Sequence, residues 1–171
     1  VPLEERFVGG NVLDADRVAD PADDAFGSSP PGDLPALPGE ALSLKPLCRG
    51  PGSVSGWIDW NRNGVFDAGE QSDVQTCSST SSVGESVTLT WTVPSDVVGG
   101  PTYARLVVAE DAAEIAPVGI VSRGEVEDHP VTLSVPRLSV MMTADVGEVP
   151  AAGHVVTYTV TLTNTGDVPF T

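Results

Sequence analysis

The stretch that decides the fold is residues 85–93, which read Glu-Ser-Val-Thr-Leu-Thr-Trp-Thr-Val and are followed by Pro94. From Val87 to Val93 every second residue is apolar, and threonines fill the positions between. A period of two places the apolar side chains on one face of an extended chain, so the pattern predicts a half-buried β-strand. Pro94 lacks the N–H that a sheet ladder needs and predicts where the strand ends.

Similar strands are predicted on both sides of this stretch, at residues 41–47, 53–60, 102–109 and 125–135, with residues 119–121 as a further candidate. Gly and Pro punctuate the intervals between them, and no apolar period of 3.6 residues runs for three turns. Short strands at regular spacing are typical of sandwiches. The sequence therefore predicts an all-β protein built as an antiparallel β-sandwich.

The composition changes twice along the chain. Residues 1–33 are crowded with Asp, Pro and Gly and predict an acidic, loop-rich lead-in. Residues 34–136 contain the predicted sandwich. Residues 137–171 contain two more alternating strands, at 138–143 and 154–164. Because two or three strands are too few for an independent sandwich, this tail is expected to be the truncated start of a second, immunoglobulin-like β domain.

The charge balance excludes several classes of partner. The chain has 24 acidic and 8 basic residues, a formal net charge of −16. Nucleic acids and anionic membrane surfaces need clustered Lys and Arg, so neither is an expected partner. No apolar run approaches the roughly 20 residues of a membrane span. Divalent cations suit such a surface because they offset repulsion between carboxylates, although acidity alone also gives solubility.

The two cysteines, Cys48 and Cys77, are 29 residues apart. No CxxC or Cys/His cluster accompanies them, which argues against a zinc site. A disulfide is the simplest interpretation, and it implies an oxidising, extracellular compartment. The alternative is a pair of buried free thiols.

Residues 59–70 read Asp-Trp-Asn-Arg-Asn-Gly-Val-Phe-Asp-Ala-Gly-Glu and match the twelve-residue calcium loop of EF-hands. Side chains two residues apart in a tight loop converge on one point, and Ca²⁺ takes six to eight oxygen ligands. A glycine at Gly64 permits the sharp turn. The expected ligands are the side chains of Asp59, Asn61, Asn63, Asp67 and Glu70 and the backbone carbonyl of Val65.

The context of the loop differs from an EF-hand, because strand-like residues precede it where an EF-hand has a helix. A structural Ca²⁺ is therefore expected rather than a sensor. Asn in place of Asp at two positions lowers the ligand charge, so Glu125 is added as a candidate ligand. The alternative is an Asn/Asp/Gly turn that binds no ion.

Glu125 belongs to the sequence Gly-Glu-Val-Glu-Asp at residues 124–128. Alternation places Glu125 and Glu127 on one face of the predicted strand and Asp128 on the other. Besides a role at the calcium loop, two interpretations stay open. The segment can be a solvated edge strand, or Arg105 can form an ion pair with Glu127.

Residues 56–66, the Gly-Glu-Gln at 69–71, Thr-Tyr-Ala-Arg at 102–105 and Gly-Glu-Val-Glu-Asp at 124–128 resemble the GEVED domain of secreted bacterial proteins in order and spacing. The resemblance covers about residues 34–135. His129 stands where the family usually has an aromatic residue. The family occurs in large modular surface or secreted proteins, so the resemblance implies display, adhesion or spacing and no reaction.

The tail resembles a second surface family, the repeat known as domain of unknown function eleven, through residues 138–140 and 156–166. That repeat commonly has a Lys where this chain has Met142. Because Lys45 is the only lysine in the chain, a lysine-based isopeptide bond within the tail is excluded.

The sequence thus predicts a non-catalytic, calcium-stabilised extracellular module of a bacterial surface or secreted protein, acting in adhesion, display or as a stalk. Its expected partners are neighbouring domains of the same protein, with a host, glycan or self-association partner unnamed.

An alternative is a carbohydrate- or ligand-binding module in which an exposed Trp57 or Trp60 stacks on sugars. Glu70 and Glu125 could in principle serve glycoside hydrolysis, but no catalytic grouping accompanies them, so an enzyme is not expected. The tail could also pair with strands of another chain.

Overall fold

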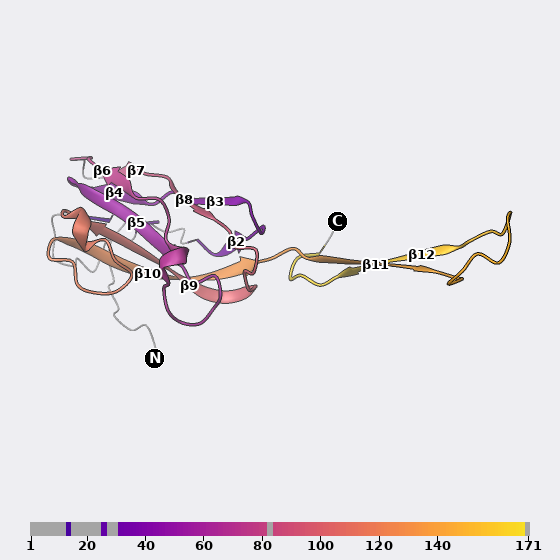
Figure 1. The fold of residues 1–171 in the computed structure, drawn as a ribbon. Helices are drawn as coiled ribbons and strands as arrows, with labels where there is room; N and C mark the ends of the chain where they lie inside the picture. Colours follow the sequence, from indigo (N-terminus) through magenta and orange to yellow (C-terminus); the bar gives the residue numbers. More distant parts are fainter. Residues whose placement is uncertain (1–12, 15–24, 27–30, 82–83, 170–171) are drawn as a thin grey trace.

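The computed structural model describes residues 13–14, 25–26, 31–81 and 84–169, and their fold is all-β (Figure 1). The described helical turns are two short 3₁₀ segments, η1 (Ala68–Glu70) and η2 (Ala112–Glu114). The strands are β1 (Leu13–Asp14), β2 (Asp33–Pro35), β3 (Ala41–Leu44), β4 (Leu47–Arg49), β5 (Gly52–Ile58), β6 (Gln75–Cys77), β7 (Glu85–Ser86), β8 (Leu89–Thr92), β9 (Gly100–Ala109), β10 (Gly124–Ser134), β11 (Leu138–Ala144) and β12 (Tyr158–Asn164).

The main sheet has five strands in the order β2-β10-β9-β5-β6. Its centre is antiparallel, with β9 paired to β10 on one side and to β5 on the other, while β2 joins β10 in parallel. The register sets Ile58 beside Ala104 and Ala104 beside His129 across the three central strands. This register determines which side chains of the candidate site come together.

Two smaller sheets, β3-β8 and β1-β4-β7, supply the opposing residues of the core. Trp91 of β8 crosses the core and packs against Gly56 of β5. A Cβ atom at Gly56 would lie 2.9 Å from the Trp91 ring, so only glycine leaves room for the indole there. The predicted antiparallel sandwich is confirmed as an all-β fold of packed sheets.

A second, smaller apolar cluster covers the outer face of the main sheet. Trp57 of β5 and Val107 of β9 are buried there under Phe66, which comes from the loop at residues 59–70. Ile115 and Val121, from the long connection between β9 and β10, pack against the same cluster. The candidate calcium loop is thus held on the sheet by an apolar side chain of its own.

The predicted disulfide between Cys48 and Cys77 is confirmed. Both residues are fully buried, and the bond joins β4 of one sheet to β6 of the main sheet. The bridge therefore joins a small sheet covalently to the main sheet.

Several details differ from the sequence-based prediction. The lead-in contributes β1, which pairs with β4, and a buried Ala25, so its described parts pack on the sandwich. Residues 119–121 are not a strand, and the short strands β2 and β6 were not predicted. The predicted strands at 41–47 and 85–93 are each divided between two sheets, because β3 pairs with β8 whereas β4 pairs with β7. The acidic stretch at residues 15–24 lies outside the described residues.

The tail forms a two-stranded antiparallel hairpin, β11-β12, that extends away from the sandwich (Figure 1). All residues of both strands are exposed. One face carries Val140, Met142, Val160 and Leu162, which lie opposite one another in the register. Among the described residues, no helix is long and apolar enough to cross a membrane.

Candidate calcium-binding loop

The loop begins where β5 leaves the main sheet. The Asp59 N–H donates to the Tyr103 carbonyl at 3.2 Å, and the Asp59 carbonyl accepts the Thr102 hydroxyl at 2.9 Å. These two bonds continue the β5–β9 pairing by one residue and hold the first loop position rigidly on the sheet. The loop ends in η1, where the Glu70 N–H donates to the Asp67 carbonyl.

Asp59 organises the turn. Its buried carboxylate accepts the N–H of Asn63 on Oδ1 at 3.1 Å and the N–H of Gly64 on Oδ2 at 2.9 Å. Gly64 has a φ of +79°, a conformation that glycine adopts without strain. The chain therefore folds back around the Asp59 side chain, as the sequence pattern predicts.

The three polar side chains at the third, fifth and ninth loop positions converge. The amides of Asn61 and Asn63 both donate to Oδ2 of Asp67, at 3.3 Å and 3.0 Å. The amide oxygens of Asn61 and Asn63 each accept the N–H two residues further on, at 2.9 Å and 2.7 Å. Each amide oxygen keeps a second lone pair for another partner.

Glu70 closes the loop from the inside. Its carboxylate is buried and accepts the Trp60 N–H on Oε1 and the Asp67 N–H on Oε2, both at 2.9 Å. Burial raises the pKa of Glu70, and the nearby Asp59 charge adds to the rise, while the backbone N–H groups oppose it. The Glu70 carbonyl accepts the Trp91 indole N–H at 3.0 Å, which anchors the end of the loop to the core.

The donor set fits a hard cation, because the expected ligand atoms of residues 59–70 are all oxygens. The pKa of Glu70 is raised because its carboxylate is buried. A bound cation would oppose this rise, because it favours the ionised carboxylate. Among the described residues, the carboxylates of Asp59, Asp67 and Glu70 do not lie within 4.8 Å of one another as a set. Coordination would therefore draw these side chains inward, with the amides of Asn61 and Asn63 turning their oxygens toward the ion.

The structure does not bring Glu125 to the loop. Glu125 lies opposite Val108, whereas the loop leaves β5 next to Ala104, four residues away along β9. At about 3.3 Å per residue the offset is roughly 13 Å along the strand alone. The expectation that Glu125 completes the coordination sphere is thus not supported, because the register separates the two.

Glu125 and Glu127 instead point into the sandwich, together with His129. Both oxygens of Glu127 accept the N–H of Ala25, at 3.2 Å and 3.0 Å, and one of them contacts Nε2 of His129 at 2.9 Å. The His129 ring meets the Phe26 ring edge-on. This strand is therefore no solvated edge. Its buried face contacts Ala25 and Phe26 of the lead-in. The sequence pattern places the two glutamates on one face but does not predict this contact.

Arg105 pairs with Asp128, not with Glu127. The two residues lie directly opposite in the β9–β10 register, and Nε and Nη2 of Arg105 donate to the two carboxylate oxygens, at 2.7 Å and 2.6 Å. Arg105 also donates to the Pro117 carbonyl and lies over the Phe66 ring, 5.1 Å from its centroid. The alternative of an Arg105–Glu127 pair is wrong because Glu127 faces the other side of the sheet.

The two tryptophans beside the loop cannot stack on a sugar as the structure stands. Trp57 is 1% exposed and Trp60 is 2% exposed. Trp57 packs with Phe66 and Val107, and Trp60 belongs to the main core. The carbohydrate-binding alternative therefore loses the residues on which it depended.

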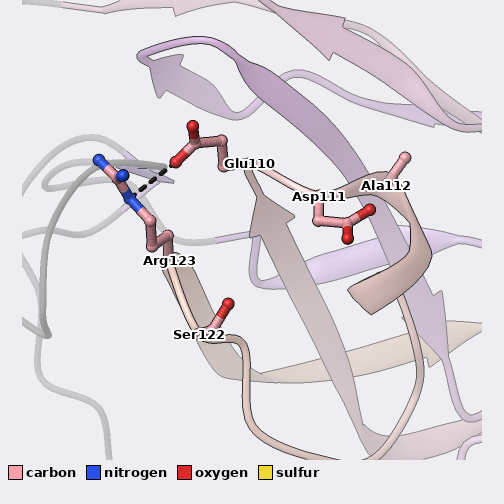
Figure 2. Close-up of a pocket in the computed structure, with 5 residues that line it drawn as sticks. All are labelled: Glu110, Asp111, Ala112, Ser122 and Arg123. Atoms are coloured by element: carbon pink, nitrogen blue, oxygen red, sulfur yellow. Dashed lines mark ion pairs between the residues drawn. The ribbon is translucent and has the colours of Figure 1, made fainter.

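Two other groups of polar side chains lie close together, and neither forms a binding site. Oxygen and sulfur atoms of Glu85, Cys48 and Cys77 lie within 4.8 Å of one another, but the cysteines are bonded to each other and offer no thiolate to a metal. A shallow pocket of about 410 Å³ is lined by Glu110, Asp111, Ala112, Ser122 and Arg123, whose side chains are drawn in Figure 2. Nε of Arg123 lies 2.7 Å from the Glu110 carboxylate, and both side chains are exposed. This is an ordinary surface ion pair and does not indicate a ligand.

Comparison with known proteins gives a match to one family model, which covers less than half of the chain. Searches of curated proteins and of solved structures give no significant match. The predicted resemblance of the tail to a second surface repeat stays a prediction. The match that is found spans β5 to β10, including the loop, the Arg105–Asp128 pair and the Gly-Glu-Val-Glu-Asp strand. Residues 53–132 match the family model of the GEVED domain.

Proposed function

We propose that this chain is a non-catalytic extracellular module of a bacterial surface or secreted protein, in which the loop at residues 59–70 binds a structural Ca²⁺. The observation that carries the proposal is the convergence of the Asn61 and Asn63 side chains on the Asp67 carboxylate, inside a loop whose candidate ligand atoms are all oxygens. The GEVED match, the buried disulfide and the net charge of −16 support a secreted, cation-binding context.

The physical role of the ion is to hold an acidic loop in place. Asp59 and Glu70 are both buried, and each is held mainly by backbone N–H groups. A divalent cation between the loop side chains would neutralise charges that otherwise repel one another. The module would then serve adhesion, display or spacing through neighbouring domains of the same protein, and no reaction is proposed for it.

Calcium titration tests the proposal directly. With Asn at two ligand positions, affinity is expected in the weak extracellular class, about 10⁻⁴–10⁻³ M. At about 10 mM free Ca²⁺ the free energy of unfolding should then rise by about 1.4–2.7 kcal/mol. Calorimetric titration and melting with and without EDTA measure both quantities at low ionic strength.

Matched variants sharpen the test. Asp67→Ala removes an exposed carboxylate at the point of convergence and should abolish the calcium-dependent gain while leaving the protein folded. Asp96→Ala removes another exposed aspartate, in the turn after β8, and should leave the gain unchanged. A wild-type melting temperature that EDTA and Ca²⁺ leave unchanged would eliminate the calcium proposal.

A further inference from the structure

Arg62 connects the loop to a segment that the calcium pattern does not include. It sits between Asn61 and Asn63 and is a non-glycine residue with a positive φ, +58°. Its guanidinium donates to the carbonyls of Gly99 and Pro101, at 2.6 Å and 3.0 Å. A second bond in the same place runs from the Val98 N–H to the Trp60 carbonyl at 2.9 Å. Residues 97–101, the bridging segment, are thus bonded to the loop through Arg62 and Trp60.

The opposite side of the bridging segment holds the base of the β11-β12 hairpin. The Val97 carbonyl accepts the Arg137 guanidinium at 2.7 Å. The Asp167 carboxylate lies where a Cβ atom at Gly99 would stand, so this close contact needs glycine. The Asp167 N–H also donates to the Val135 carbonyl, and the Thr165 N–H donates to the Arg137 carbonyl, both at 3.0 Å.

The two sets of contacts meet on adjacent residues. Gly99 contacts Arg62 through its carbonyl and Asp167 through its Cα side, and Gly100 has the Arg62 guanidinium 2.8 Å from its Cβ position. Gly100 has a φ of +113°, which favours glycine. Gly99 needs glycine for a different reason, because the Asp167 carboxylate occupies the position of a Cβ atom. Both strands of the hairpin are exposed, so the contacts at its base carry much of its attachment to the sandwich.

We infer that the loop at residues 59–70 controls how firmly the β11-β12 hairpin is held on the sandwich, through Arg62 and the bridging segment. The inference rests on the proposed calcium site. An ion coordinated by the neighbours of Arg62 restricts the backbone on both sides of that residue, and so keeps its guanidinium on Gly99 and Pro101. The bridging segment then presents a fixed surface to Arg137 and Asp167. Calcium would in this way stiffen the connection to whatever the hairpin belongs to.

Hydrogen exchange at the Thr165 and Asp167 amides measures the coupling, and calorimetry measures Ca²⁺ binding in the same samples. In the wild-type protein, Ca²⁺ should slow exchange at both amides by about five- to tenfold, the worth of one net hydrogen bond. Arg62→Asn removes the guanidinium, and Asn tolerates the positive φ of this position. This variant should bind Ca²⁺ at least as tightly, because Arg62 supplies no ligand oxygen, yet lose the slowing.

Two further variants complete the test. Arg123→Asn removes an exposed arginine in the connection before β10 and should behave as the wild type does. Gly99→Ala places a methyl group where the Asp167 carboxylate lies, and should speed exchange at both amides without changing Ca²⁺ affinity. Buried Trp57 and Trp60 report by fluorescence that each variant is folded.

The outcomes separate the inference from the proposed function. Calcium binding without any change at Thr165 and Asp167, or a slowing that Arg62→Asn retains, would overturn the coupling and leave the calcium site intact. A wild-type protein that binds no Ca²⁺ in calorimetry would instead refute the proposed function, and the ion-controlled coupling with it.

Discussion

At the scale of single residues, alternation predicts which face a side chain occupies but not what covers that face. The sequence correctly separates Glu125 and Glu127 from Asp128. It does not reveal that the glutamates face the core, because carboxylates on one side of a strand usually mark the solvent side. Their cover comes in part from Ala25, about a hundred residues away in the chain. A contact between residues so far apart in the chain produces no local sequence pattern that could predict it.

The ion pair between Arg105 and Asp128 should matter more for stability than an exposed one. Their side chains are 11% and 12% exposed, whereas Arg123 and Glu110 are 63% and 44% exposed. Asp128→Ala leaves the Arg105 charge uncompensated in a nearly dry site and should cost about 3 kcal/mol. Glu110→Ala is the matched control and should cost under about 1 kcal/mol. Urea unfolding of both variants gives the comparison, and equal losses would contradict it.

Glu85 should give the protein part of its acid sensitivity. The N–H groups of Ser78 and Ser79 donate to its carboxylate, at 2.6 Å and 2.9 Å, and the Ser78 bond is the main cause that lowers the pKa of Glu85 below its ordinary 4.5. Because the folded pKa is the lower one, the stabilisation is complete above pH 4.5 and is lost as the pH falls through the folded value.

Glu85→Gln should therefore flatten the fall in unfolding free energy below pH 4.5. The control is Glu40→Gln, at an exposed turn before β3, which should leave the acid limb as it is in the wild type. Chemical denaturation at a series of pH values measures the slope. If Glu85→Gln keeps the wild-type slope, the carboxylate does not provide the stabilisation assigned to it.

At the scale of elements, long alternating strands and the loop were predictable, whereas very short strands were not. Residues 87–93 alternate over seven positions, and most of this stretch is β8, although Glu85 and Ser86 form the separate strand β7. The loop has a ligand-type residue at nearly every second position. β1 and β6 are only two and three residues long, too short for any period to show. Their pairing depends on partners distant in sequence. Elements of this length are defined by the sheet they join rather than by their own residues.

The disulfide is the strongest test of how these short elements are held. It closes a separation of 29 residues, so the loop-entropy relation predicts a contribution of about 3–4 kcal/mol. Replacing both Cys48 and Cys77 by Ala should lower the unfolding free energy by about that amount, since β6 and β4 then lose their covalent link. Urea midpoints of the oxidised wild type and the double variant measure it. A loss under about 1 kcal/mol would mean that the sheets hold β4 and β6 without the bond.

At the scale of the whole molecule, the chain divides into a buried sandwich and an exposed hairpin. The two alternating strands after residue 136 predict this hairpin, and its assignment to a second domain stays a prediction. The sequence could not predict that the hairpin keeps an apolar face in the open, since alternation alone implies a covered side. Val140, Met142, Val160 and Leu162 are all more than half exposed. A two-stranded ribbon in water is only marginally stable by itself.

Hydrogen exchange should therefore divide the molecule into two parts. Amides of β9 and β10, at the centre of the main sheet, should exchange only through global unfolding, whereas those of β11 and β12 should exchange through local opening. If the opening free energies of the sandwich and the hairpin differ by a few kcal/mol, their exchange rates should differ by about a thousandfold or more.

The measurement should be repeated over a range of protein concentrations. Uniform protection at high dilution would contradict the division, because a hairpin without cover has too little buried surface to match the sandwich. Protection of β11 and β12 that rises with concentration would show that a second copy covers the apolar face, since only an intermolecular contact depends on concentration.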